Sequence, residues 1–270
     1  MKLNNKKKNS FLDNNNLSSV QKLLKIMEYL RDPEKGCAWD IEQTFSSISP
    51  YTIEEAYEVA QAIQDENFDN LREELGDLLL HVLFYAKIGS EKNKFNIGII
   101  AKELTNKLIR RHPHIYNHVK IKTTDDVLSN WEKIKLKEGR SSILDGVPKN
   151  LPPILKAQRI QDKVSSVGFD WKKSEDVLEK LDEEILEFKE ELNKKNKDNL
   201  EEEFGDILFS LINLSRHYKI NPYDALEKSN IKFVKRFKFI EEKTKKIKKQ
   251  IYDLDLKEID ILWEQSKKET

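Results

Sequence analysis

Two stretches of the chain, EEAYEVAQAIQDENFDNLREELGDLL (54–79) and EEILEFKEELNKKNKDNLEEEFGDIL (183–208), align without a gap. The offset is 183 − 54 = 129 throughout. The identical positions are mostly acids and turn-forming residues, and in the first copy they are Glu54, Glu55, Glu58, Asn67, Asp69, Asn70, Leu71, Glu73, Glu74, Gly76, Asp77 and Leu79. A period this long indicates a duplicated domain rather than a solenoid repeat.

The repeat extends beyond these stretches with small changes of offset. Its further pairs are Lys107 with Lys232, Arg111 with Arg236, Trp39 with Trp171 and Trp131 with Trp263. The segment DGVPKNLPP (145–153) brings three prolines together and marks the junction. We therefore predict a disordered tail (1–16), an N-terminal domain (17–140), a linker (141–153) and a homologous C-terminal domain (154–270).

Composition favours an all-α fold and a reducing compartment. Only 8 glycines and 7 prolines occur in 270 residues, and few segments alternate apolar with polar residues, so helix is the expected structure. The single cysteine, Cys37, excludes an intramolecular disulfide. Basic and acidic residues balance at 48 each, so neither nucleic acid nor an anionic membrane is an expected partner. We predict a cytoplasmic protein.

Each repeat contains an antiparallel helical hairpin with acids on both arms. The turns DENFDN (65–70) and KKNKDN (194–199) are rich in Asn and Asp, which favour turns over helix. Residues three apart share a helix face, which pairs Glu55 with Glu58 and Glu74 with Asp77. Both pairs stand at similar heights above the turn, so four carboxylates are expected to converge in one layer in each repeat.

Such a layer favours a bound cation. Clustered carboxylates repel one another beside apolar helical runs, and a divalent ion removes that repulsion. Oxygen ligands favour Mg²⁺, with Mn²⁺ as a substitute. A di-iron bundle would need Glu-x-x-His, and none of the five histidines has Glu three residues before it. A zinc site at RRHPHIY (110–116) lacks supporting cysteines, and a solvated acidic face is the simplest alternative to any metal site.

Cations and aromatic residues suit a phosphorylated ligand. Lys232 and Arg236 stand four residues apart on one helix face, and the same pattern recurs at Lys107 and Arg111. Solvated bases on a lysine-rich helix are the alternative interpretation. Trp131 and Trp263 precede lysine-rich ends and could either stack a base or anchor a terminal helix.

Together these residues resemble the MazG family of all-α nucleoside triphosphate pyrophosphohydrolases. The resemblance rests on the doubled EExxE and ExxD pattern and on LRDPEKGCAWD (30–40), RRHPHIY and VGFDW (167–171), and it covers Val20 to Glu269. It implies a homodimer of helical bundles that cleaves NTPs and dNTPs between the α- and β-phosphates with Mg²⁺. The products would be the monophosphate and pyrophosphate.

The resemblance also implies residue roles in the C-terminal domain. The metal ligands would be Glu184, Glu187, Glu203 and Asp206. The nucleotide contacts would be Lys180, Asn199, Leu200, Glu201, Glu202, Lys232, Arg236 and Trp263. A further carboxylate, Glu183 or Glu202, could act as the catalytic base, and the sequence leaves that choice open.

The N-terminal domain carries the matching second site. Its residues are Glu55, Glu58, Glu74, Asp77, Lys107, Arg111 and Trp131. One position departs from the pattern, because Lys180 corresponds to Tyr51 (180 − 129 = 51). The C-terminal domain is therefore the expected main catalytic unit. A catalytically silent, metal-dependent scaffold or regulatory dimer is the alternative from another functional class.

Overall fold

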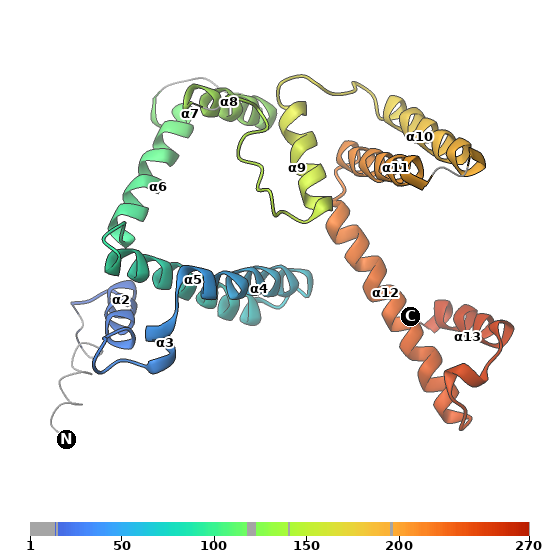
Figure 1. Ribbon diagram of the computed structural model, residues 1–270, viewed down its shortest axis with the longest axis horizontal. Coiled ribbons are helices and arrows are strands. Elements are labelled where there is room, and N and C mark those ends of the chain that lie inside the picture. Colours follow the sequence, from blue (N-terminus) through green and yellow to red (C-terminus); the bar gives the residue numbers. More distant parts are fainter. Residues whose placement is uncertain (1–13, 15, 118–122, 140, 195–196, 270) are drawn as a thin grey trace. The chain divides into compact units, whose positions relative to one another are not determined.

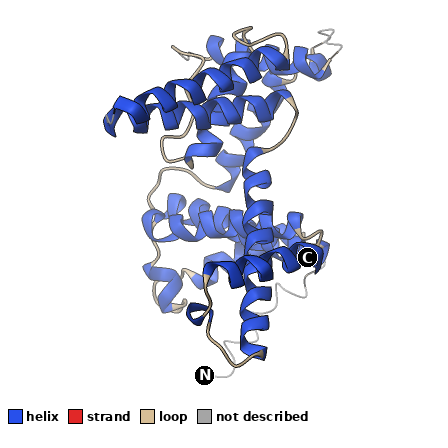
Figure 2. Ribbon diagram, turned by 90° about the vertical axis from the view of Figure 1, so that its right-hand side faces the viewer, coloured by secondary structure: helices blue, strands red, loops and turns tan. Residues whose placement is uncertain are grey.

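The computed structural model describes residues 14, 16–117, 123–139, 141–194 and 197–269. Every regular element in these ranges is a helix, and Figure 2 shows helices joined by loops. The all-α prediction is confirmed. None of the described helices combines the length and apolar character needed to cross a bilayer. The predicted tail 1–16 lies almost wholly outside the described residues.

Contacts divide the chain into two units, 1–119 and 120–270. The helices of the first unit are α2 (Ser19–Leu30), α3 (Ala38–Glu42), α4 (Phe45–Gln64), α5 (Phe68–Glu91), α6 (Ile97–Arg111) and α7 (Pro113–Tyr116). The helices of the second are α8 (Thr124–Lys137), α9 (Pro153–Ser165), α10 (Ser174–Lys194), α11 (Lys197–His217), α12 (Pro222–Lys246) and α13 (Leu256–Glu269), with a 3₁₀ turn at Ile251–Asp253. In Figure 1 the pairs α4/α5 and α10/α11 each run side by side.

Local sequence signals explain the first hairpin. Thr44 caps α4 by accepting a hydrogen bond from the Ser47 N–H, and the Ser47 side chain reciprocates in a capping box. Glu66 then adopts a left-handed conformation (φ 52°) in the turn. Asn67 caps α5 by accepting from the Asn70 N–H. Glu66 and Asn67 lie in the turn expected from sequence, and they mark where α4 ends and α5 begins.

The core of the first unit lies where α2 and the start of α4 meet the second half of α5. Met27, Ile48, Leu83, Phe84 and Ile88 are almost fully buried there. This apolar anchor holds the hairpin at the end remote from its turn. The acids on α4 and α5 lie between the anchor and the turn.

A buried ion network ties α8 to α9 in the second unit. The Lys163 side chain is 2% exposed, and its ammonium contacts the Glu132 carboxylate at 3.2 Å. It also donates to the carbonyls of Ile143 (2.8 Å) and Asp145 (3.3 Å). The contacts that divide the chain likewise group α8 with the second unit, although the repeat aligns it with the end of the first. The domain boundaries 17–140, 141–153 and 154–270 stay predictions.

Candidate active site

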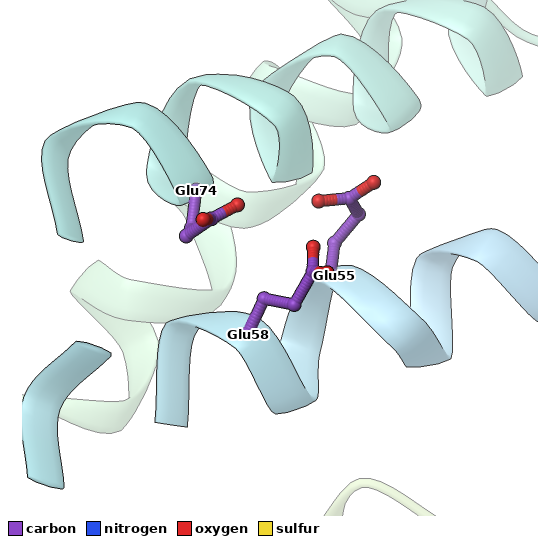
Figure 3. Close-up of side chains that lie close together, drawn as sticks. All are labelled: Glu55, Glu58 and Glu74. Carbon is purple, nitrogen blue, oxygen red and sulfur yellow. The ribbon is translucent and has the colours of Figure 1, made fainter. Parts of the chain in front are cut away.

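Three carboxylates of the first hairpin converge in the space between its helices. Glu55 and Glu58 project from α4 toward α5, and Glu74 projects back from α5 (Figure 3). One oxygen of each lies within 4.8 Å of the others. Desolvation raises the pKa of the Glu55 carboxyl above its ordinary value, and the charges of Glu58, Asp77 and Glu74 raise it further. The neighbouring carboxylates thus oppose the ionisation of Glu55.

The second hairpin repeats this cluster. Glu184 and Glu187 on α10 and Glu203 on α11 each place a carboxylate oxygen within 4.8 Å of the others. Glu184 is buried, whereas Glu187 is exposed. Desolvation raises the pKa of the Glu203 carboxyl, and the charges of Glu187, Asp206 and Glu184 add to the rise. The predicted convergence of acids therefore appears in both repeats.

The aspartates stand slightly apart from these groups. Asp77 and Asp206 follow Glu74 and Glu203 by one helical turn, and neither belongs to the three-carboxylate group of its hairpin. Both still act on the clusters electrostatically, since Asp77 raises the pKa of Glu74 and Asp206 that of Glu203. An aspartate side chain is one methylene shorter than a glutamate, which accounts for its smaller reach across the hairpin.

The donor set fits a hard divalent cation. Each cluster offers carboxylate oxygens from two helices, close enough together to bind one ion, and negative neighbours help to raise the pKa of Glu55 in the first cluster and of Glu203 in the second. Such oxygen ligands are those that Mg²⁺ and Mn²⁺ prefer. A site of this kind leaves coordination positions for water and phosphate.

Lys180 distinguishes the second cluster from the first. Its ammonium lies 2.8 Å from a Glu183 oxygen and 2.9 Å from a Glu184 oxygen. Hydrogen bonds to these two carboxylates raise the pKa of Lys180 above its ordinary value. The counterpart position on α4 holds Tyr51, which is exposed. The family resemblance implies a phosphate contact for Lys180, and the structure adds an ion pair between Lys180 and a cluster carboxylate.

The predicted nucleotide-binding side chains on α12 and α13 also lie together. The Arg236 guanidinium stands over the Trp263 ring, 5.8 Å from its centroid, and the Phe233 ring lies 5.2 Å from that of Trp263. Lys232 is exposed one turn earlier on α12. Phe233, which the sequence analysis missed, is signalled by its spacing of three from Arg236.

The predicted contacts at the start of α11 are differently placed. Glu201 and Glu202 are exposed and Leu200 is half-buried. The Asn199 amide donates to the Glu191 carboxylate across the hairpin (3.1 Å), and the Lys194 ammonium contacts the same carboxylate at 2.7 Å. Asn199 therefore braces the closed end of the hairpin, a structural role that the repeat alone did not reveal.

The structure brings together some, but not all, of the residues expected beside the N-terminal cluster. Lys107 and Arg111 share a face of α6, as their spacing predicts, and Lys107 is exposed. Trp131 lies on α8, whose contacts belong to the second unit. Its predicted role beside Lys107 and Arg111 stays a prediction.

Comparison with known proteins supports this interpretation of both hairpins. The model of the MazG nucleotide pyrophosphohydrolase domain matches the chain twice, at residues 43–116 and 172–240. These ranges contain α4 with α5 and α10 with α11, the four helices that carry the acids. This chain belongs to the MazG family. The predicted tandem duplication is thereby confirmed.

Two individual relatives match over nearly their whole length, and a third matches over half of its own. A nucleoside triphosphate pyrophosphohydrolase of Escherichia coli K12 is 42% identical over 259 residues, covering 94% of this chain and 98% of the relative. A Thermotoga maritima protein, named nucleoside triphosphate pyrophosphohydrolase/pyrophosphatase MazG, is 44% identical over 250 residues, covering 92% and 95%. The YabN protein of Bacillus subtilis is 44% identical over 246 residues, which are 90% of this chain and 50% of YabN.

Proposed function

We propose that this chain hydrolyses nucleoside triphosphates, and their deoxy forms, to the monophosphate and pyrophosphate. One observation carries the proposal: the helices that match the MazG domain model are those that converge their carboxylates. The names of the full-length relatives supply the reaction class.

We assign Mg²⁺ as the working ion, with Mn²⁺ able to replace it. Glu184, Glu187 and Glu203 would hold it, and Asp206 would contribute from one turn further along α11. When bound, such an ion polarises a phosphoryl oxygen and lowers the pKa of its bound water. Glu183 and Glu202 are the two candidates for accepting the proton from the attacking water.

The chain's own side chains would bind and orient the polyphosphate. Lys180 borders the second cluster and can offer its ammonium to a phosphate oxygen. Arg236 and Lys232 share a face of α12, and Trp263 offers an aromatic ring beside Arg236. A base can stack on such a ring, and the guanidinium fork suits phosphate.

We further propose that the enzyme is a homodimer. Large apolar side chains remain exposed along α10 and α11, among them Leu186 (59%), Phe204 (53%) and Leu208 (47%). The corresponding helices α4 and α5 expose Ile63, Phe68, Leu75 and Leu79 in the same way. Extended apolar surface of this kind marks an interface. In a two-fold symmetric dimer, the same hairpin of a second copy would cover it. Light scattering after size exclusion is expected to give twice the mass of the chain.

Product analysis tests the reaction directly. Purified protein incubated with each NTP and Mg²⁺ is expected to yield the monophosphate and pyrophosphate in equal amounts, and excess EDTA is expected to stop the reaction. Orthophosphate with a diphosphate would show that the wrong bond had been assigned. Absence of turnover with every NTP would favour the silent-scaffold alternative instead.

A further inference from the structure

We propose that Lys180 is an internal counter-ion of the second carboxylate cluster, which a divalent metal must displace and which polyphosphate then receives. The inference rests on the proposed function and adds a coupling between metal and nucleotide binding. The two repeats differ at this point: among the described residues, a lysine forms an ion pair with the second cluster, and none does so with the first.

The ion pair engages the cluster itself. Lys180 lies one helical turn before Glu184 on α10, and its ammonium is 2.9 Å from a Glu184 oxygen. The Glu184 side chain is only 8% exposed and belongs to the group that could hold an ion. A carboxylate this buried depends strongly on its partner, because little water is available to solvate it. The second contact of Lys180, Glu183, is 56% exposed and lies outside the cluster.

Metal and ammonium compete for this position. A cation bound by Glu184 would stand within a few ångströms of the Lys180 ammonium, and two positive charges at that distance repel each other. Lys180 is one-third exposed and has a flexible four-carbon stem, so its ammonium can swing away. Binding metal alone therefore costs the Lys180–Glu184 ion pair.

A bound polyphosphate changes that balance. Phosphate oxygens beside the ion would give the displaced ammonium a new anionic partner. Metal and nucleotide are then expected to bind the second cluster cooperatively, and linkage requires the coupling to be reciprocal.

The first cluster has a tyrosine in place of this lysine. Tyr51 stands where α10 has Lys180, and the main charges that act on the Glu55 carboxyl among the described residues are those of Glu58, Asp77 and Glu74, all negative. Without a competing ammonium, the first cluster is expected to bind divalent ions more tightly than the second when nucleotide is absent.

Mn²⁺ binding to the nucleotide-free, full-length protein tests the proposal. Binding is followed by the paramagnetic resonance signal of free Mn²⁺. A Glu58→Gln background removes a ligand of the first cluster and isolates the second. Adding Lys180→Gln is expected to tighten Mn²⁺ binding about tenfold. Lys180→Arg keeps the positive charge and is expected to bind as weakly as the background protein.

Two further variants test whether a change in Mn²⁺ affinity comes from the ammonium beside the cluster rather than from the net charge of the protein or from misfolding. Lys189→Gln removes an exposed positive charge from the same helix and is expected to leave the Mn²⁺ affinity unchanged. In a Glu187→Gln background, which isolates the first cluster, Tyr51→Lys is expected to weaken Mn²⁺ binding about tenfold.

The possible failures are distinguishable. Unchanged or weaker Mn²⁺ binding by the Lys180→Gln protein would overturn the counter-ion role while leaving the metal sites in place. Equal tightening by Lys189→Gln would reduce the effect to general charge and also overturn it. Absence of Mn²⁺ binding in both background proteins would overturn the metal assignment of the proposed function together with this inference.

Discussion

At the residue scale, the chain keeps like charges close together at two places. Glu55, Glu58 and Glu74 approach one another in the first hairpin, and their counterparts do so in the second. Repulsion within each group costs stability when no ion is bound. Replacing one cluster glutamate is therefore expected to lower turnover while it leaves the stability of the metal-free protein unchanged or raises it.

Replacing Glu187 by Ala is expected to lower turnover by at least about 100-fold, since a metal-holding group is lost. The melting temperature of the metal-free protein is expected to stay the same or rise, because one source of repulsion disappears. Glu179→Ala removes an exposed acid from α10 outside the cluster and serves as the control. A destabilised but active Glu187→Ala protein would indicate a structural role for this side chain.

Glu74 gives the cluster a pH signature. Desolvation and then the charges of Glu58, Asp77 and Glu73 raise its folded-state pKa above the unfolded value of 4.5. The folded state therefore binds more protons in that window, and the stability contributed by Glu74 falls as pH rises from 4.5 through the raised pKa. In denaturant unfolding of the metal-free proteins, the free energy of unfolding of Glu74→Gln is expected to increase relative to that of the native chain as the pH rises over this range. A stability difference independent of pH would contradict the assigned environment.

At the element scale, sequence predicted the two acid-bearing hairpins and the approach of their glutamates. Helical periodicity and Asn-rich turns were sufficient, because both signals are local. The Lys180–Glu184 pair was also within reach, since residues four apart share a helix face. The separation of Asp77 and Asp206 from the glutamates could not be predicted from sequence, because it depends on how far side chains extend between two packed helices.

The turn of the first hairpin can be tested through its cap. Asn67 accepts a hydrogen bond from the Asn70 N–H at 3.1 Å and starts α5, which carries Glu74. Asn67→Ala is expected to lower the free energy of unfolding by about 1 kcal/mol, whereas Asn67→Asp keeps a capping oxygen and most of the stability. Equal losses in the two variants, measured by urea denaturation, would show that the cap contributes little.

At the scale of the whole molecule, the duplication was visible in the sequence, but the place where contacts separate the units was not. The repeat aligns α8 with α13 and so with the end of the first domain, whereas the contacts of α8 join the second unit. Within the second unit, the Lys163 ammonium on α9 also binds Glu132 on α8. No periodicity predicts an ion pair between residues 31 positions apart.

Fragments can locate that division. The fragment 120–270 keeps Glu132 and the carbonyls of Ile143 and Asp145, all of which contact Lys163. The fragment 151–270 lacks these three partners, so the buried Lys163 ammonium loses its contacts with them. We expect the shorter fragment to be less stable by about 3 kcal/mol in guanidinium unfolding. Equal stabilities would show that α8 is not part of the second folding unit.

The central claim is that hydrolysis takes place at the carboxylate cluster of α10 and α11. Both clusters converge three glutamates, but only the second has Lys180 beside it. A cation that contacts phosphate in the transition state accounts for about one to two decades of rate. The tyrosine at the first cluster offers a hydrogen bond without charge.

The most direct measurement is Mg²⁺-dependent pyrophosphate release by Asp206→Ala and Asp77→Ala proteins, compared with the native chain at saturating NTP. We expect Asp206→Ala to lose nearly all activity and Asp77→Ala to retain most of it. A greater loss in the Asp77→Ala protein would contradict the account and assign catalysis to the first cluster.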